Sequence, residues 1–494
     1  MPSTPPYVSK STYLMGLQCQ KLLWFRYNAK DQIPAPDEAT QAVFDQGKEV
    51  GELAHQLFPG GTMVAPGIIN PPEVVAETQK AIRARRPLYE AAFAFHGGYA
   101  RTDLLAPVVR DAWDLIEVKS TTSLKEEVHL PDLAFQAFIL AGAGIKVRKC
   151  FLAHINNEFV RQGPVDPRKF FTLDEVTRPV SALRRQIGDN LDAMQRVIAA
   201  KSHPETRIGP HCDNPYTCAL HDHCWSFLPD ASVFTLYRGT AKAFNLLKQG
   251  IQQLDQIPDT FPLTDNQAIQ RAVLLAGKPH IDRPALAAFL AQIEYPVSFL
   301  DFETFGTAIP LFDGSSPFQQ IPFQFSLHVR CSPDARPQHH SFLAEGTADP
   351  RPEFMRQLRT ALPDTGSVVA YNASFETTRL KECCEGLPEF RPWLRKLTPR
   401  IVDLLPPFRG FRYYHPQQNG SASMKTVLPA LTGQGYDNLA IQEGGAASRE
   451  FLRVTYSQVS DAERRRVRRD LEEYCGLDTY GMVQIVNELA RLVK

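Results

Sequence analysis

Two acidic side chains and a lysine in the first quarter of the chain have the types and spacing of a metal-dependent hydrolytic site. Asp103 is followed fourteen residues later by Glu117 and then by Lys119. On a strand, residues two apart point to the same side, so Glu117 and Lys119 would face one cleft. Two carboxylates bind a hard divalent cation, and the cation with a nearby ammonium polarises a phosphate and activates an attacking water. A surface charge pattern is the alternative explanation.

A second pair of acids, Asp301 and Glu303, lies in the segment Val297–Glu303, which has the composition of a strand. Alternation places both carboxylates on one face and apolar residues on the other. Burying two neighbouring acids without a cation is costly, so this pair also indicates a metal site.

Further acidic and phenolic residues follow the second pair in the sequence. Glu376 comes directly after Asn372-Ala-Ser-Phe375, and Tyr474 precedes Asp478 by four residues. In the helix expected over 461–492, residues four apart share a face. The Tyr474 and Asp478 side chains should therefore point to the same side.

Cysteine usage indicates a metal-bound segment rather than disulfides. The chain has nine cysteines, an odd number, and three of them (Cys212, Cys218 and Cys224) fall within thirteen residues. An odd count without a secretion signal favours reduced thiols. The surrounding segment, 212–229, has too few apolar residues to order itself, so unliganded buried cysteines are the weaker explanation. Zinc is an alternative occupant, because His211, His221 and His223 lie beside the thiols.

Composition limits the classes of protein that the chain can represent. The 494 residues carry 54 Lys and Arg against 54 Asp and Glu, and 43% are apolar. This excludes wholesale disorder and predicts about three domains. With net charge zero, nucleic-acid binding must come from a local groove. The longest apolar stretch, 133–147, is too short to span a bilayer. The N-terminus lacks a signal peptide, so a cytoplasmic location is expected.

The pattern of the whole chain predicts α/β architecture. Residues 1–60 are expected to be helical, 97–155 to form strands interrupted by a helix from Pro131 to Gly142, and 233–290 to form a helical connector punctuated by prolines. From residue 295 onward, strand-like and helical segments alternate, which is typical of α/β folds.

Two further residues complete a resemblance in the N-terminal part. His55 lies in Gly51-x-x-x-His55, upstream of the acids, and Gln136 lies downstream in an apolar helix. Together with the acids and lysine, in this order, they resemble the RecB-like branch of the PD-(D/E)xK nucleases, which includes the CRISPR-associated exonucleases and AddB. The resemblance implies a restriction-endonuclease-like core with these roles: metal ligands His55, Asp103 and Glu117; catalytic residues Lys119 and Gln136. Position 140 is Leu where that branch has the Tyr of a Q-x-x-x-Y motif.

The same branch often carries one cysteine before the catalytic core and three after it, which bind a [4Fe–4S] cluster. Cys19 stands before the motifs of this chain and the other three cysteines stand after them. The resemblance therefore implies an iron–sulfur staple held by Cys19, Cys212, Cys218 and Cys224. Both gaps among the last three contain five residues, whereas the branch typically has two residues in the first gap.

The acids of the C-terminal part resemble the DEDD 3′–5′ exonucleases of the RNase H-like superfamily. That family has D-x-E first, an Asn-x-x-Phe-Asp-like segment second, and Y-x(3)-D as one form of the third motif. The resemblance implies two metal ions held by Asp301, Glu303, Glu376 and Asp478, with Tyr474 as the catalytic residue that orients water. Glu376 stands where the family usually has Asp. Asp403 is interpreted as part of a non-catalytic strand.

The full chain resembles a bacterial uncharacterised family that fuses these two nuclease domains. We expect a RecB-like nuclease domain over 1–230, a helical connector over 231–290 and an RNase H-like domain over 291–494. The implied function is Mg²⁺- or Mn²⁺-dependent hydrolysis of DNA at two separate sites, with no membrane association. RNA processing by the exonuclease, or nucleic-acid binding by a protein whose sites have decayed, remain as alternatives.

Overall fold

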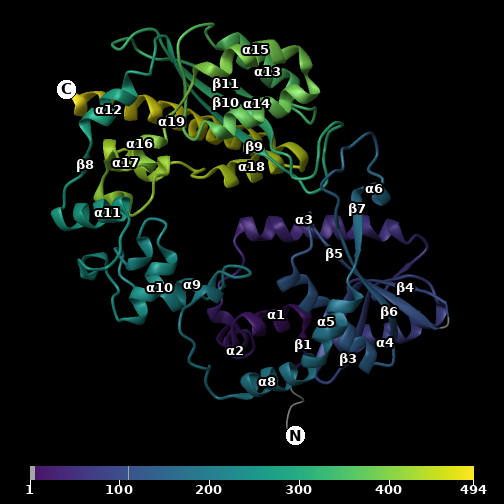
Figure 1. Cartoon of the computed structure of the whole chain (residues 1–494). Coiled ribbons are helices and arrows are strands. Elements are labelled where there is room, and N and C mark those ends of the chain that lie inside the picture. The colour runs from purple at the N-terminus through teal and green to yellow at the C-terminus, as the bar shows by residue number, and fades with distance from the viewer. Residues whose placement is uncertain (1–5, 110) are drawn as a thin grey trace. The chain divides into compact units, whose positions relative to one another are not determined.

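The computed structural model describes residues 6–109 and 111–494 (Figure 1). The chain divides into two compact units, Met1–Phe227 with Thr307–Phe318, and Leu228–Gly306 with Gln319–Lys494. Each unit contains its own mixed sheet with helices packed on it, so the protein is a multidomain α/β protein, as expected. The residues 231–290, expected as a separate connector, belong to the second unit, and the segment Thr307–Phe318 belongs to the first.

Among the described residues, seven strands form the sheet of the first unit. Their order is β2-β3-β4-β5-β6-β7, and β1 pairs with β4. The pairs β3–β4, β4–β5 and β6–β7 are antiparallel, whereas β1–β4, β2–β3 and β5–β6 are parallel. The strands are β1 Val8–Ser9, β2 Thr62–Met63, β3 Leu88–Phe95, β4 Gly98–Pro107, β5 Ala112–Lys119, β6 Lys146–Ile155 and β7 Phe171–Glu175. The helices are α1 Lys10–Gln18, α2 Gln20–Asn28, α3 Glu38–Ala54, α4 Pro71–Ala81, α5 Glu126–Gly142, α6 Pro167–Phe170, α7 Thr177–Leu183, α8 Ile187–Ala199 and α9 His221–Trp225.

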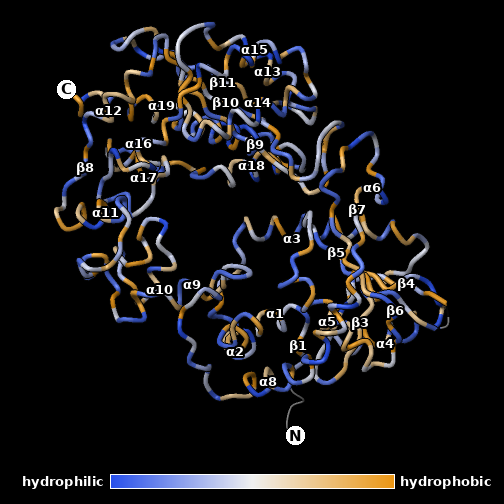
Figure 2. The backbone as a smooth tube through the Cα atoms, in the orientation of Figure 1, coloured by the Kyte–Doolittle hydropathy of each residue, from blue (hydrophilic) through white to orange (hydrophobic). Residues whose placement is uncertain are grey.

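Helices cover both faces of this sheet because its strands alternate between two cores. On β5, Leu115 packs with Leu133 of α5, and the next residue, Ile116, packs with Val50 and Ala54 of α3. Figure 2 shows hydrophobic stretches gathered along these strands. The side chains of Asp103 and Glu117 have the same parity as Leu105 and Leu115, so they face α5.

The helix α5 begins at Glu126, five residues before the expected start at Pro131. Glu126 and Glu127 lie in its first turn, where the helix dipole favours negative charge. The Lys125 amide donates a hydrogen bond to His129 Nδ1 (3.1 Å), which satisfies one of the free amides at this end. These local interactions outweigh the proline signal.

Five strands in the described part of the chain form the sheet of the second unit, in the order β11-β10-β9-β12-β13. The pairs β11–β10 and β10–β9 are antiparallel, and β9–β12 and β12–β13 are parallel. The strands of this sheet are β9 Val297–Phe305, β10 Ile321–Arg330, β11 Gln338–Leu343, β12 Val368–Ala370 and β13 Ile401–Asp403. Two short strands, β8 His280–Ile281 and β14 Tyr413–Tyr414, pair with each other in a separate antiparallel sheet. The helices are α10 Thr240–Lys248, α11 Asp265–Ala276, α12 Arg283–Leu290, α13 Arg351–Ala361, α14 Ser374–Gly386, α15 Arg391–Leu397, α16 Pro406–Arg409, α17 Met424–Thr432, α18 Gly444–Tyr456 and α19 Asp461–Val493.

The long helix α19 packs on β9 and β10, and its bounds match the expected helix over 461–492 closely. Its start is set by Ser460, whose hydroxyl accepts a hydrogen bond from the Glu463 amide (3.2 Å). The opposite face of the sheet packs against α13, α14 and α15 through Leu300, Phe302 and Phe325. Among the described residues, no helix is both long enough and apolar enough to span a bilayer.

Candidate functional site

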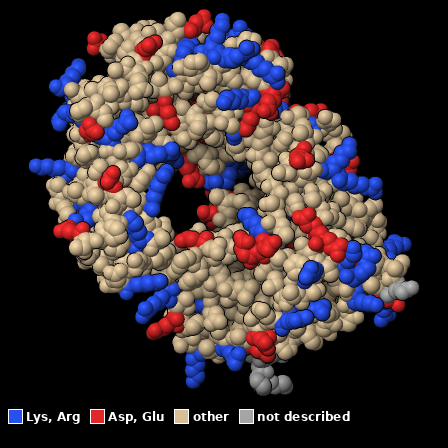
Figure 3. All heavy atoms as spheres, viewed as in Figure 1, with Lys and Arg blue, Asp and Glu red and all other residues tan. Residues whose placement is uncertain are grey.

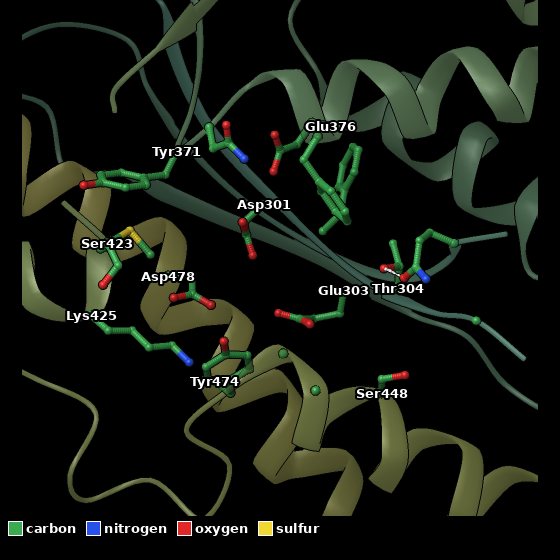
Figure 4. A pocket seen from close by; sticks show the side chains of 18 residues that line it. Asp301, Glu303, Thr304, Tyr371, Glu376, Ser423, Lys425, Ser448, Tyr474 and Asp478 are labelled. Carbon is green, nitrogen blue, oxygen red and sulfur yellow. Dashed lines mark hydrogen bonds between the residues drawn. The ribbon is translucent and has the colours of Figure 1, made fainter. Parts of the chain in front are cut away.

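A pocket of about 550 Å³ in the second unit is lined by all five side chains that the sequence predicts there: Asp301, Glu303, Glu376, Tyr474 and Asp478 (Figure 4). The acids come from three elements, β9, α14 and α19. In Figure 4 their carboxylates point into a common space. Acids from three separate parts of the sequence are therefore neighbours in the fold.

The alternation of β9 accounts for the position of its two acids. Leu300 and Phe302 enter the core under α13 and α14, so Asp301 and Glu303 must face α19. On that helix, Tyr474 and Asp478 lie about one turn apart and both face the sheet as buried residues.

Glu376 reaches the pocket because of the turn that precedes α14. Asn372 there has a positive φ of 68°. The Asp403 carboxylate holds this turn, since its Oδ1 accepts hydrogen bonds from the amides of Asn372 (3.0 Å) and Leu405 (2.9 Å). The helix begins immediately afterwards and places Glu376 in its first turn. Asp403 thus has a structural role, in keeping with its exclusion from the predicted ligands.

The acids of this pocket hold their protons unusually strongly. Burial, followed by the charges of neighbouring acids, raises the pKa of Asp301 well above its ordinary value and that of Glu303 to about 8. Burial also raises the pKa of Glu376 to about 8 and that of Asp478 to about 7, although a hydrogen bond from Tyr436 opposes the shift at Asp478. Removing these charges from water without a counter-ion is unfavourable.

Two residues of this site were not found from the sequence, Lys425 and Tyr436. The Tyr436 hydroxyl donates a hydrogen bond to Asp478 Oδ1 (2.6 Å). The Lys425 ammonium lies 5.5 Å from the ring centre of Tyr474, and its positive charge lowers the pKa values of Glu303 and Asp478. α17 can approach α19 closely at Gly481, where an added Cβ would lie 2.8 Å from Leu428. This packing sets the position of Lys425, and no sequence spacing reports it.

The donor atoms of the pocket fit a divalent cation. Ligand atoms of Asp301 and Glu303 lie within 4.8 Å of each other and of the thiol of Cys475, which is behind the pocket lining and 3.9 Å from Asp301 Oδ2. Glu376 and Asp478 line the same pocket but lie outside this group of three. Glu376 Oε2 is buried and, within the described residues, has no hydrogen-bond partner. A buried carboxylate oxygen without a donor is unfavourable unless a cation satisfies it. Carboxylate oxygens are the ligands that Mg²⁺ and Mn²⁺ prefer.

In the first unit, four predicted residues meet on the α5 side of the sheet: Asp103, Glu117, Lys119 and Gln136. Lys119 Nζ lies 2.6 Å from Glu117 Oε1. Gln136 Nε2 donates to Glu117 Oε2 (2.6 Å). Asp103 Oδ2 accepts a hydrogen bond from the Val118 amide (2.8 Å). Glu117 and Gln136 are fully buried, so their contact is well shielded from water.

Two further residues complete this cluster, and the sequence argument missed both. Asp132 Oδ1 accepts a hydrogen bond from Gln136 (2.9 Å), and its Oδ2 lies 2.8 Å from Lys119 Nζ. Lys10 Nζ contacts both Asp103 and Glu117. Asp132 stands four residues before Gln136 on the same helical face, a spacing that could have identified it. Lys10 is far from the motif in sequence and carries no such signal.

His55, predicted as a metal ligand, is not brought to these acids. Its ring stacks on Tyr89, with 4.2 Å between centroids, and burial lowers its pKa. Val50 and Ala54 of the preceding helix pack on the Ile116 face of the sheet, which directs the His55 segment away from α5. Among the described residues, His55, Asp103 and Glu117 do not form a group with ligand atoms within 4.8 Å.

The four predicted cysteines, Cys19, Cys212, Cys218 and Cys224, line one pocket of the first unit. Burial and then the neighbouring thiols raise the pKa of Cys218 to about 11, and amides of Leu22 and Lys21 donate hydrogen bonds to the Cys19 sulfur. Among the described residues, no three Cys or His donors here lie within 4.8 Å of one another. A tetrahedral zinc site with Zn–S bonds of about 2.3 Å needs sulfur atoms about 3.8 Å apart. One pair of possible donors, Cys212 Sγ and His211 Nε2, lies at such a distance, 3.8 Å.

The stability of the second unit without metal should fall as the pH rises. Between about pH 4 and pH 8, the folded protein keeps carboxyl protons that the unfolded chain releases, so the free energy of unfolding decreases through this window. Replacing Glu376 with Gln removes one of these groups and should flatten the dependence. The measurement is the melting temperature from pH 4.5 to 8.5 in EDTA. Glu473→Gln, an exposed change on α19, should keep the wild-type profile, and an equally steep profile in E376Q would contradict the assignment.

Comparisons with known proteins place few functional constraints on this chain. Residues 298–423 match the family model described as "Domain of unknown function (DUF2779)", which spans Asp301, Glu303 and Glu376. An uncharacterised protein of Mycoplasma genitalium, MG366, is 27% identical over 218 residues, 40% of this chain and 32% of that protein. Its Mycoplasma pneumoniae homologue is 25% identical over 207 residues, 38% of this chain and 31% of that protein. The chain thus matches about a third of the length of these curated relatives.

Proposed function

We propose that this protein is a divalent-metal-dependent nuclease that hydrolyses phosphodiester bonds of DNA, with an exonuclease site in the second unit. The observation that carries the proposal is the convergence of four carboxylates and Tyr474 on one pocket, where a buried Glu376 oxygen has no partner among the residues that the structure describes. The expected RNase H-like exonuclease fold has a mixed sheet whose first strand carries the D-x-E motif. The strand β9, with Asp301 and Glu303, matches that description and supports the same function.

Each residue of the pocket has a chemical role in this proposal. Asp301, Glu303, Glu376 and Asp478 would hold two divalent ions. Bound ions lower the pKa of the attacking water and stabilise charge on the attacking and leaving oxygens. The Tyr474 hydroxyl orients the water. The Lys425 ammonium, held beside Tyr474 and Tyr436, provides positive charge for the scissile phosphate.

A groove continues from the pocket and provides a path for the substrate strand. A second hollow of about 410 Å³ shares Tyr371 and Asn372 with the pocket and adds Arg238 and Arg409. Tyr237, in the segment expected as a connector, fixes this wall because its hydroxyl donates to the Arg409 carbonyl (3.2 Å). Exposed guanidinium groups bind phosphates and aromatic rings stack on bases, so the groove suits a single strand.

We infer a second nuclease site in the first unit. Asp103 and Glu117 would hold a divalent ion, and Lys119 would assist the attacking water. The direct contact of Lys119 and Gln136 with Glu117 supports this assignment, because it holds the carboxylate and the ammonium at one place on the sheet. Figure 3 shows positive and negative side chains interspersed over the visible face, so substrate binding relies on local groups.

We propose that the cysteine pocket holds an iron–sulfur cluster. Four thiolates are the usual ligands of a [4Fe–4S] cluster, and the gathering of four cysteines on one pocket supports this occupant, with zinc as the alternative. The residues Cys19, Cys212, Cys218 and Cys224 would hold it and link the N-terminal helices to the end of the first unit.

The two sites should be separable in a digestion of end-labelled single- and double-stranded DNA and RNA with Mg²⁺ or Mn²⁺. Asp301→Asn should reduce one cleavage activity more than a hundredfold, since a carboxylate that balances metal charge is lost, and Lys119→Ala should reduce the other. Glu473→Gln is the matched control. Absence of cleavage of every substrate by the folded wild-type protein would instead support a binding function, and preferential cleavage of RNA would support RNA processing.

Anaerobically purified protein should contain iron and acid-labile sulfide. Cys218→Ser should lose both and unfold the first unit more readily, because a structural metal site contributes directly to folding. Cys331→Ser provides the control, since Cys331 is exposed and distant in sequence from the pocket-lining cysteines. Stoichiometric zinc without sulfide would rule out the cluster.

Binding of a single-stranded oligonucleotide should depend on the groove arginines. The double change Arg238→Ala with Arg409→Ala should weaken binding and lower the slope of log affinity against log salt by about 1.4, or about 0.7 for each lost phosphate contact. Fluorescence anisotropy in Ca²⁺ across a salt series measures this. The double change Arg395→Ala with Lys396→Ala, exposed on α15, is the control. An unchanged slope would place the strand elsewhere.

A further inference from the structure

The ammonium group of Lys10 stands between the two acids of the first unit that would hold a divalent ion. Its Nζ lies 3.3 Å from Asp103 Oδ1 and 2.8 Å from Glu117 Oε1. Asp103 belongs to β4 and Glu117 to β5, so the Lys10 ammonium links the two strands. A divalent ion bound by both acids would occupy the same place. Lys119 differs, because its ion pairs are with Glu117 and Asp132.

The position of Lys10 is built into the fold. The preceding strand β1 pairs with β4 through Val8 and Ser9. Ser9 then caps α1 in a reciprocal arrangement with Thr12, so the helix starts at Lys10. One turn further, Tyr13 stacks on Phe135 of α5 at 4.8 Å between ring centroids. The Lys10 side chain is largely buried, with 27% of its surface exposed.

The charges around this point are nearly balanced without any added ion. In the described part of the chain, the acids Glu90, Asp103, Glu117 and Asp132 face the cations Lys10, Lys119 and Arg101. One negative charge is left over. Without Lys10 the surplus would be two negative charges, which equals the charge of one divalent ion. The second unit has no lysine paired directly with its acids in the described part of the chain. Lys425 is near enough to lower the pKa of Glu303 but forms no ion pair with it there.

We propose that Lys10 is a resident cation of the first-unit site, which must leave its place between Asp103 and Glu117 before a divalent ion binds there. The proposal rests on the metal site of the proposed function. Competition between the ammonium and the ion raises the metal concentration that the site needs. Lys10 therefore acts as a positioning residue that sets the metal affinity of this site and distinguishes it from the pocket in the second unit.

Direct measurement of Mn²⁺ binding by the full chain tests this. The double change Asp301→Asn with Asp478→Asn first removes the ligands of the second unit, so that Mn²⁺ titration followed by electron paramagnetic resonance reports on the first. In this background, Lys10→Met keeps the length of the side chain and removes its charge. It should tighten Mn²⁺ binding at least about tenfold, because the repulsion between ammonium and ion is lost. It should also lower the melting temperature of the metal-free protein.

Three controls separate the possible outcomes. Lys30→Met, an exposed change in the same part of the chain, should leave Mn²⁺ affinity unaltered. Lys10→Arg keeps the positive charge, so it should bind Mn²⁺ no more tightly than the parent protein. It also serves as the folded reference if Lys10→Met does not fold. Asp103→Asn should weaken binding, and its failure to do so would reject the metal site itself. If Asp103→Asn weakens binding while Lys10→Met leaves it unchanged or weaker, the resident-cation proposal alone is overturned.

Discussion

Repulsion among carboxylates that are buried together is the constraint on which the second unit depends. Asp301 and Glu303 cannot turn away from each other or from Asp478. Phe302, which lies between them, and Leu300, which precedes them, are fixed in the core. Asp478 is held from the other side by α19 and by the Tyr436 hydroxyl. The same packing that stabilises the sheet therefore forces like charges together. Free energy from the apolar core offsets this electrostatic cost, and a bound cation would relieve it.

The first unit meets the same problem with groups of its own. Glu117 is fully buried, and it receives contacts from Lys10, Lys119 and Gln136. These donors satisfy the carboxylate without an external ion. Two acidic clusters in one chain thus differ in their need for a cation. The Glu117 carboxylate of the first cluster is compensated by side chains within the fold, and the oxygen left without a partner there among the described residues is the neutral amide oxygen of Gln136. In the second cluster the oxygen without a described partner belongs to the Glu376 carboxylate itself.

Sequence reasoning succeeded where local periodicity determines the structure. The strand β5 with Glu117 and Lys119 on one face, the strand β9 with its two acids, and the long helix α19 all follow from patterns within a few residues. The inward direction of these side chains is a direct result of alternation.

It failed where position depends on packing between distant segments. His55 has the expected place in the sequence, but the apolar face of its helix packs on the opposite side of the sheet. Lys10, Lys425 and Tyr436 reach their acids only through contacts between segments that are distant in sequence, which no local spacing encodes. The segment 231–290 looked like a connector because its prolines break it into short helices, yet Tyr237 and Asn266 both donate hydrogen bonds to the Arg409 carbonyl and tie it into the second unit.

The helix α1 joins two features that have so far been treated separately. It begins at Lys10, beside the acids, and Cys19 of the sulfur-lined pocket follows its last residue. Nine helical residues form a rod about 13 Å long that resists bending. One stiff element therefore sets the positions of both the Lys10 ammonium and the Cys19 thiol, so the two places in the first unit are not independent of each other.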